Sequence, residues 1–236
     1  TPELRMLLRG RIDRIDTRQE EDRLYVRVVD YKSGSQTFDL VSVYYGLQIQ
    51  LVFYMEAAQE NLRKRNGNCQ IVPGGVLYYN ISDPIVDRTP DMEDADVTKA
   101  ILDKLQMNGM VTYSSLDEQE REAVEEKKSG KKGGKITVVS DQQFAAMQNY
   151  VHETVRMLGQ EIMQGQIQVN PYMKGQITAC TWCSYKSICG FDQKRRGYGY
   201  RNLASMSKEE VWNRMMEDEE ECEDGESMDT TAGTGH

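Results

Sequence analysis

Residues 23–32 carry the pattern that most restricts how this chain can fold. In a β-strand alternate side chains share one face, and here that face would carry Leu24, Val26, Val28, Asp30 and Lys32. An acidic residue and a lysine thus continue an apolar stripe that we expect to be buried. Because an unpaired buried charge is strongly destabilising, each of the two needs a partner in the fold. The pattern predicts a sheet whose core ends in charged side chains.

A β-hairpin is predicted on the amino-terminal side of this strand. Residues 6–16 are also short and rich in β-forming residues, and a polar stretch separates them from residues 23–32. In such a hairpin the carboxylate of Asp13 can approach that of Asp30. Asp16 lies three residues further along, so it faces the other side, and we interpret it as a turn residue.

Helical and strand patterns alternate along the rest of the chain. We expect Asp39 to be the N-cap of one long amphipathic helix over about 41–64, which places Gln50 and Tyr54 one turn apart on one face. The other expected elements are a strand at 76–81, helices at about 93–106 and 115–127, a strand at 136–139, and a helix from Ser140 or Asp141 to about 164. A strand-strand-helix-strand core with added helices predicts an α/β or α+β fold.

The charged residues of the expected hairpin and helix suggest one chemistry. Two carboxylates, Asp13 and Asp30, repel each other unless a divalent cation lies between them, and such a cation also activates water. Lys32 is then placed to stabilise charge on a phosphate oxygen, with Gln50 and Tyr54 on the adjacent helix. Together these residues predict a metal-dependent phosphodiesterase site.

Three cysteines form a separate cluster near the carboxyl end. Cys180, Cys183 and Cys189 have the spacing Cys-x2-Cys-x5-Cys, whereas Cys69 and Cys222 stand alone. Clustered thiols without partners for disulfides predict a reducing cytoplasm and a metal site. From spacing alone, zinc with a fourth ligand elsewhere stays an alternative.

The formal charge of −9 comes from one segment. Nine acidic residues lie between Glu217 and Asp229, and without them the chain has 29 acidic and 29 basic residues. We expect this acidic tail to be disordered and the body to be neutral. The basic residues at 127–135 and 194–196 are either solvated loops or contacts to DNA phosphates.

Membrane insertion and secretion are not expected. The mean hydropathy is −0.67 and no apolar run approaches ~18 residues. The chain opens with Thr1-Pro2-Glu3, without a Met or a signal sequence, and so we expect a cytoplasmic piece of a longer protein. It has no Gly-x4-Gly-Lys-Ser/Thr phosphate loop, and we do not expect this chain to hydrolyse ATP.

Three of these segments together resemble the RecB-like branch of the PD-(D/E)XK nuclease superfamily. They are Gly10-Arg11-Ile12-Asp13-Arg14-Ile15-Asp16, Val28-Val29-Asp30-Tyr31-Lys32-Ser33-Gly34 and Gln48-Ile49-Gln50-Leu51-Val52-Phe53-Tyr54. The resemblance implies an α/β core, a mixed sheet flanked by helices, over residues 1–175. It also implies that Asp13 and Asp30 hold Mg²⁺, with Mn²⁺ as a possible substitute, that Lys32 is catalytic, and that Gln50 and Tyr54 lie behind the site.

Over residues 4–192 the chain is similar to nuclease domains of the B subunits of bacterial ATP-dependent helicase/deoxyribonucleases. The similarity implies a Mg²⁺-dependent DNA exonuclease that cuts unwound single strands during double-strand-break processing, with the helicase-nuclease A subunit as its partner. Within residues 176–200, Cys180, Cys183 and Cys189 resemble three of the four ligands of a [4Fe-4S] cluster, whose fourth cysteine lies upstream in the family. Residues 201–236 are then a helix and the acidic tail.

Two other functions stay open from the sequence. One is an iron-sulphur DNA-binding or docking module whose nuclease site has lapsed; the presence of Asp13, Asp30 and Lys32 together argues against it. The other is a stand-alone CRISPR-associated nuclease, which shares the chemistry and the cysteine cluster.

Overall fold

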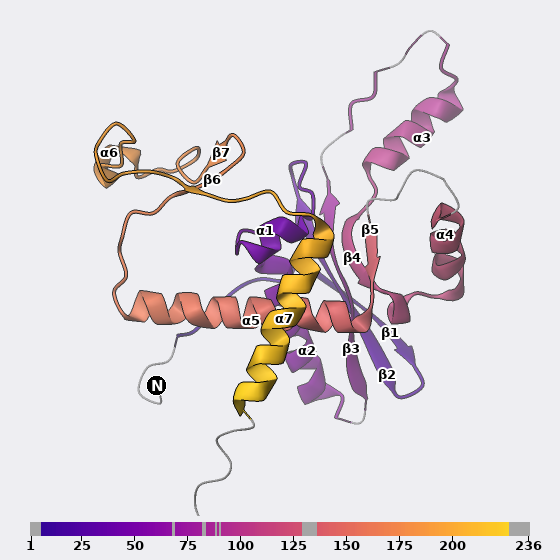
Figure 1. The fold of residues 1–236 in the computed structure, drawn as a ribbon. Helices are drawn as coiled ribbons and strands as arrows, with labels where there is room; N and C mark the ends of the chain where they lie inside the picture. The colour runs from indigo at the N-terminus through magenta and orange to yellow at the C-terminus, as the bar shows by residue number, and fades with distance from the viewer. Residues whose placement is uncertain are drawn as a thin grey trace, which may run out of the picture.

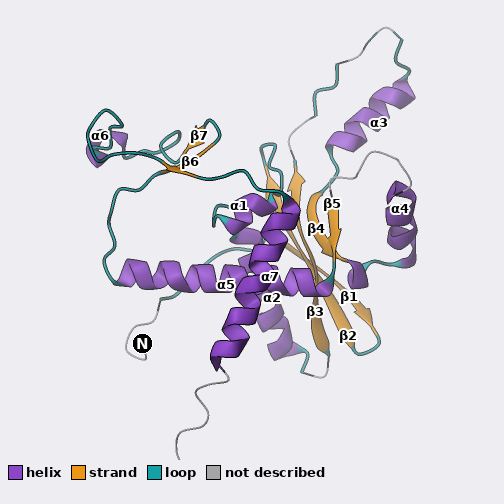
Figure 2. Cartoon of the chain, viewed as in Figure 1, coloured by secondary structure: helices purple, strands orange, loops and turns teal. Residues whose placement is uncertain are grey.

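The fold is a mixed α/β sheet with helices packed against it (Figures 1 and 2). The computed structural model describes residues 6–226, apart from 68, 82–83, 88, 90 and 129–135. The five strands of the main sheet, in spatial order, are β1 (Arg14–Glu20), β2 (Arg23–Lys32), β3 (Gln70–Asn80), β4 (Asn108–Thr112) and β5 (Ile136–Val139). The β1–β2 and β3–β4 pairs are antiparallel, and the β2–β3 and β4–β5 pairs are parallel.

The parallel pairing of β2 with β3 requires a crossover, because the chain must return to the end of the sheet at which β2 began before it can form β3. Helices α1 (Leu40–Tyr44) and α2 (Gln50–Arg65) supply it. Asp39 caps α1 as predicted, and its side chain accepts a hydrogen bond from the backbone of Val41. The crossover places the start of α2 beside the end of β2.

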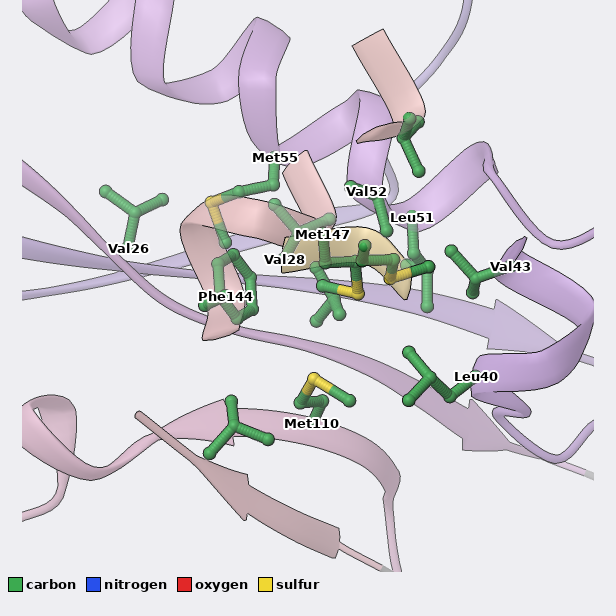
Figure 3. Packing of buried hydrophobic residues seen from close by; sticks show 14 of the residues in the cluster. Val26, Val28, Leu40, Val43, Leu51, Val52, Met55, Met110, Phe144 and Met147 are labelled. Atoms are coloured by element: carbon green, nitrogen blue, oxygen red, sulfur yellow. The ribbon is translucent and has the colours of Figure 1, made fainter. Parts of the chain in front are cut away.

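The main core lies between one face of the sheet and the helices α2, α5 (Asp141–Met163) and α7 (Lys208–Glu226) (Figure 3). From the sheet, Val26, Val28 and Val76 are fully buried. The helical side chains that meet them include Leu51, Val52, Met55, Phe144, Met147, Val151, Val211, Trp212 and Met215. Ser140 caps α5 with a capping box, which decides between the two N-caps expected for this helix.

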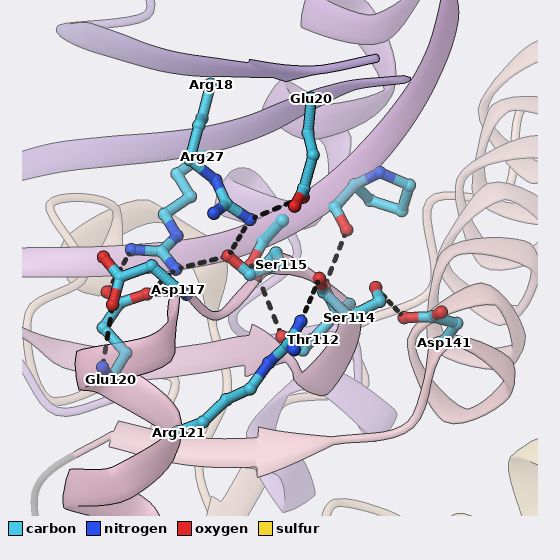
Figure 4. A network of polar contacts seen from close by, with 12 residues as sticks. Arg18, Glu20, Arg27, Thr112, Ser114, Ser115, Asp117, Glu120, Arg121 and Asp141 are labelled. Atoms are coloured by element: carbon cyan, nitrogen blue, oxygen red, sulfur yellow. Dashed lines mark hydrogen bonds and ion pairs between the residues drawn. The ribbon is translucent and has the colours of Figure 1, made fainter. Parts of the chain in front are cut away.

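A smaller apolar cluster of Val29, Leu77, Val111 and Leu116 covers the opposite face. Here the chain passes through the 3-10 turn η1 (Tyr113–Ser115) into α4 (Glu118–Lys128). Arg27 on β2 reaches Glu120 on α4 with two hydrogen bonds of 2.7 and 2.8 Å, and it also donates to the Ser115 carbonyl (Figure 4). The helix α3 (Asp94–Lys104) precedes β4.

The predicted hairpin exists, but its first strand was placed too early. β1 begins at Arg14, and residues 6–13 are not a strand. Of the polar residues that we expected to form the connection, those up to Glu20 belong to β1, as does Asp16, which pairs with Arg27 of β2. The turn is only two residues long, at Glu21 and Asp22. An edge strand exposes many of its side chains to water, and so a polar sequence can form one.

Two other elements differ from expectation. The single helix at 41–64 is broken into α1 and α2, because Gly46 adopts a left-handed conformation (φ +73°) directly after Tyr45, the C-cap of α1. The strand expected at 76–81 begins earlier, at Gln70, and includes Pro73-Gly74-Gly75. Strand β4 was not predicted. It is buried along its whole length and has no alternation of polar and apolar residues.

The carboxyl-terminal part forms a second, three-stranded sheet followed by α7. This sheet consists of β6 (Tyr172–Lys174), β7 (Ile177–Thr178) and β8 (Arg201–Asn202), and the short helix α6 (Lys186–Cys189) lies between β7 and β8.

Helix α7 continues to Glu226, and so the prediction of disorder from Glu217 onward is wrong for residues 217–226. Residues 227–236, and the lysine-rich segment at 129–135, lie outside the described residues. Within the described part of the chain, no helix has the length and apolar character to cross a membrane.

We predict that Glu120→Gln loosens α4 from the sheet. The hydrogen bond from Arg27 lowers the pKa of Glu120 despite its partial burial. The ionic contribution is therefore present above the ordinary pKa of Glu, about 4.3, and is lost as the pH falls through the lower folded value. We expect a loss of about 1 kcal/mol at pH 7, or about 2–4 °C in melting temperature, after allowance for solvent screening.

The matched control for this prediction is Glu118→Gln, two residues earlier in α4, where no partner is found among the described residues. The melting temperatures of the two variants should differ at pH 7 and be similar at pH 3, where the ionic contribution is lost. Equal melting temperatures for Glu120→Gln and Glu118→Gln at pH 7 would contradict the proposed contribution of the Arg27 ion pair.

Candidate active site

The candidate site lies where β2 ends. Asp30 and Lys32 extend from the same face of β2, as predicted, with Asp30 4% exposed. Lys32 Nζ lies 2.6 Å from Asp30 Oδ2. This contact is an ion pair without the angles of a hydrogen bond, and Oδ2 is a buried oxygen with no hydrogen-bond partner among the described residues. The carboxylate therefore faces positive charge but keeps an unsatisfied oxygen.

The start of α2 joins the site through the side chain of Lys32. Lys32 Nζ donates to Gln50 Oε1 at 3.3 Å, and Gln50 Nε2 donates to the Tyr54 hydroxyl at 3.1 Å. Gln50 and Tyr54 are four residues apart, which puts them on one face of the helix. The structure thus brings four of the five predicted site residues into one chain of contacts: Asp30, Lys32, Gln50 and Tyr54.

Asp13 reaches the same end of the sheet from the segment before β1. Its Oδ2 accepts a hydrogen bond from the backbone N–H of Tyr31 at 3.0 Å. The carboxylate of Asp13 is therefore fixed beside the peptide that follows Asp30. The sequence placed Asp13 within a strand, whereas in the structure it lies just before β1 and contacts β2 through this side-chain hydrogen bond.

Gly10 brings the amino-terminal segment against Tyr54. A Cβ atom at Gly10 would lie 2.7 Å from Tyr54 Cε1 and 3.1 Å from its hydroxyl oxygen. Only glycine allows the backbone to approach the ring this closely. The ring of Tyr54 is therefore held between its own helix and the segment that leads to Asp13.

Two asparagines hold the loop after Lys32, and sequence reasoning missed both. Asn80 exchanges two hydrogen bonds with the backbone of Gln36, each 3.0 Å long. Asn108 donates to the same Gln36 carbonyl at 3.0 Å and accepts from the Phe38 N–H at 2.8 Å. These contacts tie the loop to β3 and β4. Nothing in the sequence marks them, because the partners lie far apart along the chain and only the folded sheet brings them together.

Tyr78 lies against the candidate site, and sequence reasoning did not single it out. It is the pairing partner of Asp30 on β3, is 3% exposed, and lies under Lys32 with 5.5 Å from Nζ to the ring centroid. Burial, and then the charge of Asp30, raises the pKa of Tyr78 to about 12. The phenol is therefore neutral at physiological pH and adds no second negative charge beside Asp30.

The carboxylates of Asp13 and Asp30 suit a hard divalent cation. Mg²⁺ prefers carboxylate oxygens and is often bound by one or two carboxylates together with waters and a substrate phosphate. The buried Oδ2 of Asp30, to which no described residue donates a hydrogen bond, is an oxygen that such a cation would satisfy. No three His, Cys, Asp or Glu side chains among the described residues are grouped to hold a metal, and so the protein would provide only part of a coordination shell.

The three clustered cysteines do not converge on a metal site. Cys180 and Cys183 are half-buried, Cys189 is exposed, and all three are free thiols. They are not grouped as metal ligands in the described part of the chain, and the arrangement does not fit an iron-sulphur cluster held by these residues alone. Sequence spacing predicted a cluster segment here, but spacing alone does not fix the directions of the thiols.

An ion pair joins this cysteine-bearing segment to the first helix of the crossover. Lys174 on β6 contacts the carboxylate of Asp39, and its ammonium lies 2.6 Å from Ser42 Oγ. Burial opposes ionisation of Asp39, but hydrogen bonds from Lys174 and Ser42 outweigh it and lower the pKa of Asp39. The N-cap of α1 is therefore also the anchor of the second sheet.

Comparison with known proteins connects this geometry to a family. The family model described as the PD-(D/E)XK nuclease superfamily matches residues 2–190, which include all five predicted carboxylate, lysine, glutamine and tyrosine site residues. The B subunit of the ATP-dependent helicase/deoxyribonuclease of Lachnoclostridium phytofermentans is 39% identical over 248 residues, which cover 97% of this chain and 21% of that protein.

Two further relatives have the same name. The Acetivibrio thermocellus protein is 35% identical over 224 residues, and the Bacillus anthracis protein is 34% identical over 229 residues. Each match covers 91% of this chain, but only 20% and 19% of the respective relative. The chain thus spans about a fifth of the length of the curated relatives that it matches. With a family match that extends over most of its residues, the chain belongs to the PD-(D/E)XK nuclease superfamily and is a nuclease domain.

Proposed function

We propose that this domain is a Mg²⁺-dependent DNA exonuclease, with Asp13, Asp30, Lys32, Gln50 and Tyr54 as its site residues. The observation that supports this most directly is the buried Asp30 oxygen, which has no hydrogen bond from any described residue and lies beside the Lys32 ammonium. Such an arrangement is destabilising in a purely structural role, because a buried carboxylate normally accepts several hydrogen bonds. It is suited to a site that receives a cation and a phosphate.

Each side chain has a task in phosphodiester hydrolysis. Asp13 and Asp30 would hold the cation, and the chemistry that a bound Mg²⁺ supplies is Lewis-acid polarisation of the phosphate. Lys32 donates to a non-bridging phosphate oxygen and stabilises the charge that develops there. Gln50 orients the Lys32 ammonium through its amide oxygen, and the hydroxyl of Tyr54 fixes which way the Gln50 amide points.

The names of the relatives support a proposal for the wider role. Their names describe the B subunit of an ATP-dependent helicase/deoxyribonuclease. We infer that the domain acts on DNA strands that a helicase has unwound, in the processing of double-strand breaks, and that the longer protein pairs with an A subunit. Manganese is an acceptable substitute for Mg²⁺, because both are hard cations with oxygen ligands.

A [4Fe-4S] cluster is part of the same proposal and rests on the spacing of Cys180, Cys183 and Cys189. Three thiolates do not complete a four-cysteine cluster, so a fourth ligand has to come from outside these residues. The cluster would then require the cysteine segment to rearrange.

The competing docking function with a lapsed nuclease site is disfavoured, because the contacts from Asp30 to Tyr54 are intact.

The first prediction for the site concerns the two charged residues of β2. Asp30→Asn and Lys32→Met should each lower Mg²⁺-dependent cleavage of labelled single-stranded DNA at least about 100-fold, because each removes a charge that acts on the reacting phosphate. Folding should be retained, and the Asp30→Asn protein should melt no lower than the unaltered chain.

Asp16→Asn is the matched control, because Asp16 lies on β1 and pairs with Arg14 rather than with the site. Asp13→Asn, three residues away, should behave like Asp30→Asn. Cleavage at an unaltered rate by Asp30→Asn, or an equal loss for Asp13→Asn and Asp16→Asn, would overturn the assignment of the site.

The second prediction uses the close approach of Gly10 to Tyr54. Gly10→Ala forces the tyrosine ring to move and breaks its hydrogen bond with Gln50. We expect cleavage to fall about tenfold, the typical effect of a misplaced supporting group, with little change in melting temperature. Gly34→Ala is the control, since a Cβ there meets nothing within 4 Å. Similar rates for the two variants would show that the position of Tyr54 does not matter.

The third prediction concerns iron. The longer protein, purified without oxygen, should be brown and contain about four irons per chain if the cluster forms. Cys183→Ser should remove the colour, whereas Cys69→Ser, at an isolated cysteine, should not. Stoichiometric zinc in a colourless protein would support the alternative site that the cysteine spacing leaves open.

A further inference from the structure

Among the described residues the ammonium of Lys32 has three neighbours, and one of them has no part in the proposed chemistry. Asp30 Oδ2 lies at 2.6 Å and Gln50 Oε1 at 3.3 Å, while the third neighbour is the ring of Tyr78, whose centroid is 5.5 Å away. A lysine side chain has four flexible carbons, and its position depends on what surrounds its charged end. Each neighbour therefore affects where the charge of Lys32 lies.

The ring of Tyr78 is the most rigid of these neighbours. Tyr78 is 3% exposed and belongs to the main core, together with Val28 and Val76. The parallel register of β2 and β3 sets Tyr78 directly beside Asp30, on the face from which Lys32 extends. Its ring cannot turn away without disturbing that core, and so its position relative to β2 is fixed by the sheet.

The other two contacts are less able to hold Lys32 during the reaction. In the proposed function Asp30 binds the cation. The cation then neutralises the negative charge that attracts Lys32. The hydrogen bond to Gln50 is long. An aromatic face, in contrast, attracts an ammonium group within about 6 Å without carrying a charge or accepting a proton. The attraction between the Tyr78 ring and the Lys32 ammonium is the same whether or not Asp30 has bound the cation.

We propose that Tyr78 is a positioning residue for the cleavage reaction, and that the face of its ring holds the Lys32 ammonium where the phosphate binds. This inference rests on the proposed function and adds a residue to it. Tyr78 does not touch the substrate; it acts through Lys32. The aromatic ring is the required feature, and the phenolic hydroxyl is not, because no described residue forms a hydrogen bond with it.

The test replaces the ring without emptying its space. Tyr78→Phe should cleave single-stranded DNA within about twofold of the unaltered chain, because the ring is kept. Tyr78→Leu should lower the single-turnover rate about tenfold, from the loss of the cation–π attraction. Affinity for the same DNA, measured in EDTA, should stay within about twofold for every variant, since the effect is on the position of Lys32 during the reaction.

A fluorinated series removes the ambiguity of a core substitution. Incorporation of 4-fluorophenylalanine and then 3,4,5-trifluorophenylalanine at position 78 keeps the shape of the ring but withdraws its electrons. The rate should fall stepwise from Phe to the trifluoro variant, a trend that a purely structural role would not produce. Tyr79→Leu is the control, because Tyr79 lies on the other face of β3 and packs edge-on against Tyr31, with 5.8 Å between centroids.

The outcomes separate the two claims. Equal rates for phenylalanine and trifluorophenylalanine at position 78 overturn the positioning role, while the cleavage by the unaltered chain still supports the nuclease. An equal loss from Tyr79→Leu and Tyr78→Leu also overturns it. Absence of cleavage by the unaltered chain, with both Mg²⁺ and Mn²⁺, overturns the proposed function and this inference with it.

Discussion

The burial of the Asp30 carboxylate at the end of β2 is the constraint on which the rest of the structure depends. A carboxylate that is 4% exposed needs compensation, and within the described residues it receives only the ammonium of Lys32 at 2.6 Å. The neighbouring elements are arranged around this pair. Strand β3 presents the ring of Tyr78, and α2 begins with Gln50, so that the lysine has neighbours on each side.

The break between α1 and α2 makes that arrangement possible. A continuous helix from Leu40 would carry Gln50 along the axis set by α1, whereas the left-handed turn at Gly46 lets α2 begin in a new direction, with Gln50 as its first residue. The loop before α1 is equally constrained. Asn80 and Asn108 satisfy its backbone groups from β3 and β4, and the path from Lys32 to Asp39 is therefore fixed by the sheet.

The second sheet and the residues that follow it up to Ala204 are joined to this framework through polar side chains. Lys174 shares the carboxylate that caps α1, and Tyr45 donates from its hydroxyl to the Ala204 carbonyl at 3.0 Å. Helix α7 then returns Val211 and Met215 to the main core. The cysteine segment between these anchors is exposed over much of its surface, and Trp182 is 90% exposed.

The sequence by itself determined the strand of Asp30 and Lys32, the hairpin before it, the cap at Asp39 and the i,i+4 pair of Gln50 and Tyr54. The strands and the Gln50–Tyr54 pair follow from repeats of two and four residues, and the cap follows from an acidic side chain just before a helical pattern; local backbone geometry fixes all of them. Only the tertiary structure decided the true start of β1, the break at Gly46, the existence of β4 and the place of Tyr78 beside Asp30. These depend on pairing between distant strands, and periodicity within one segment contains no information about which strand lies next to it or in what register.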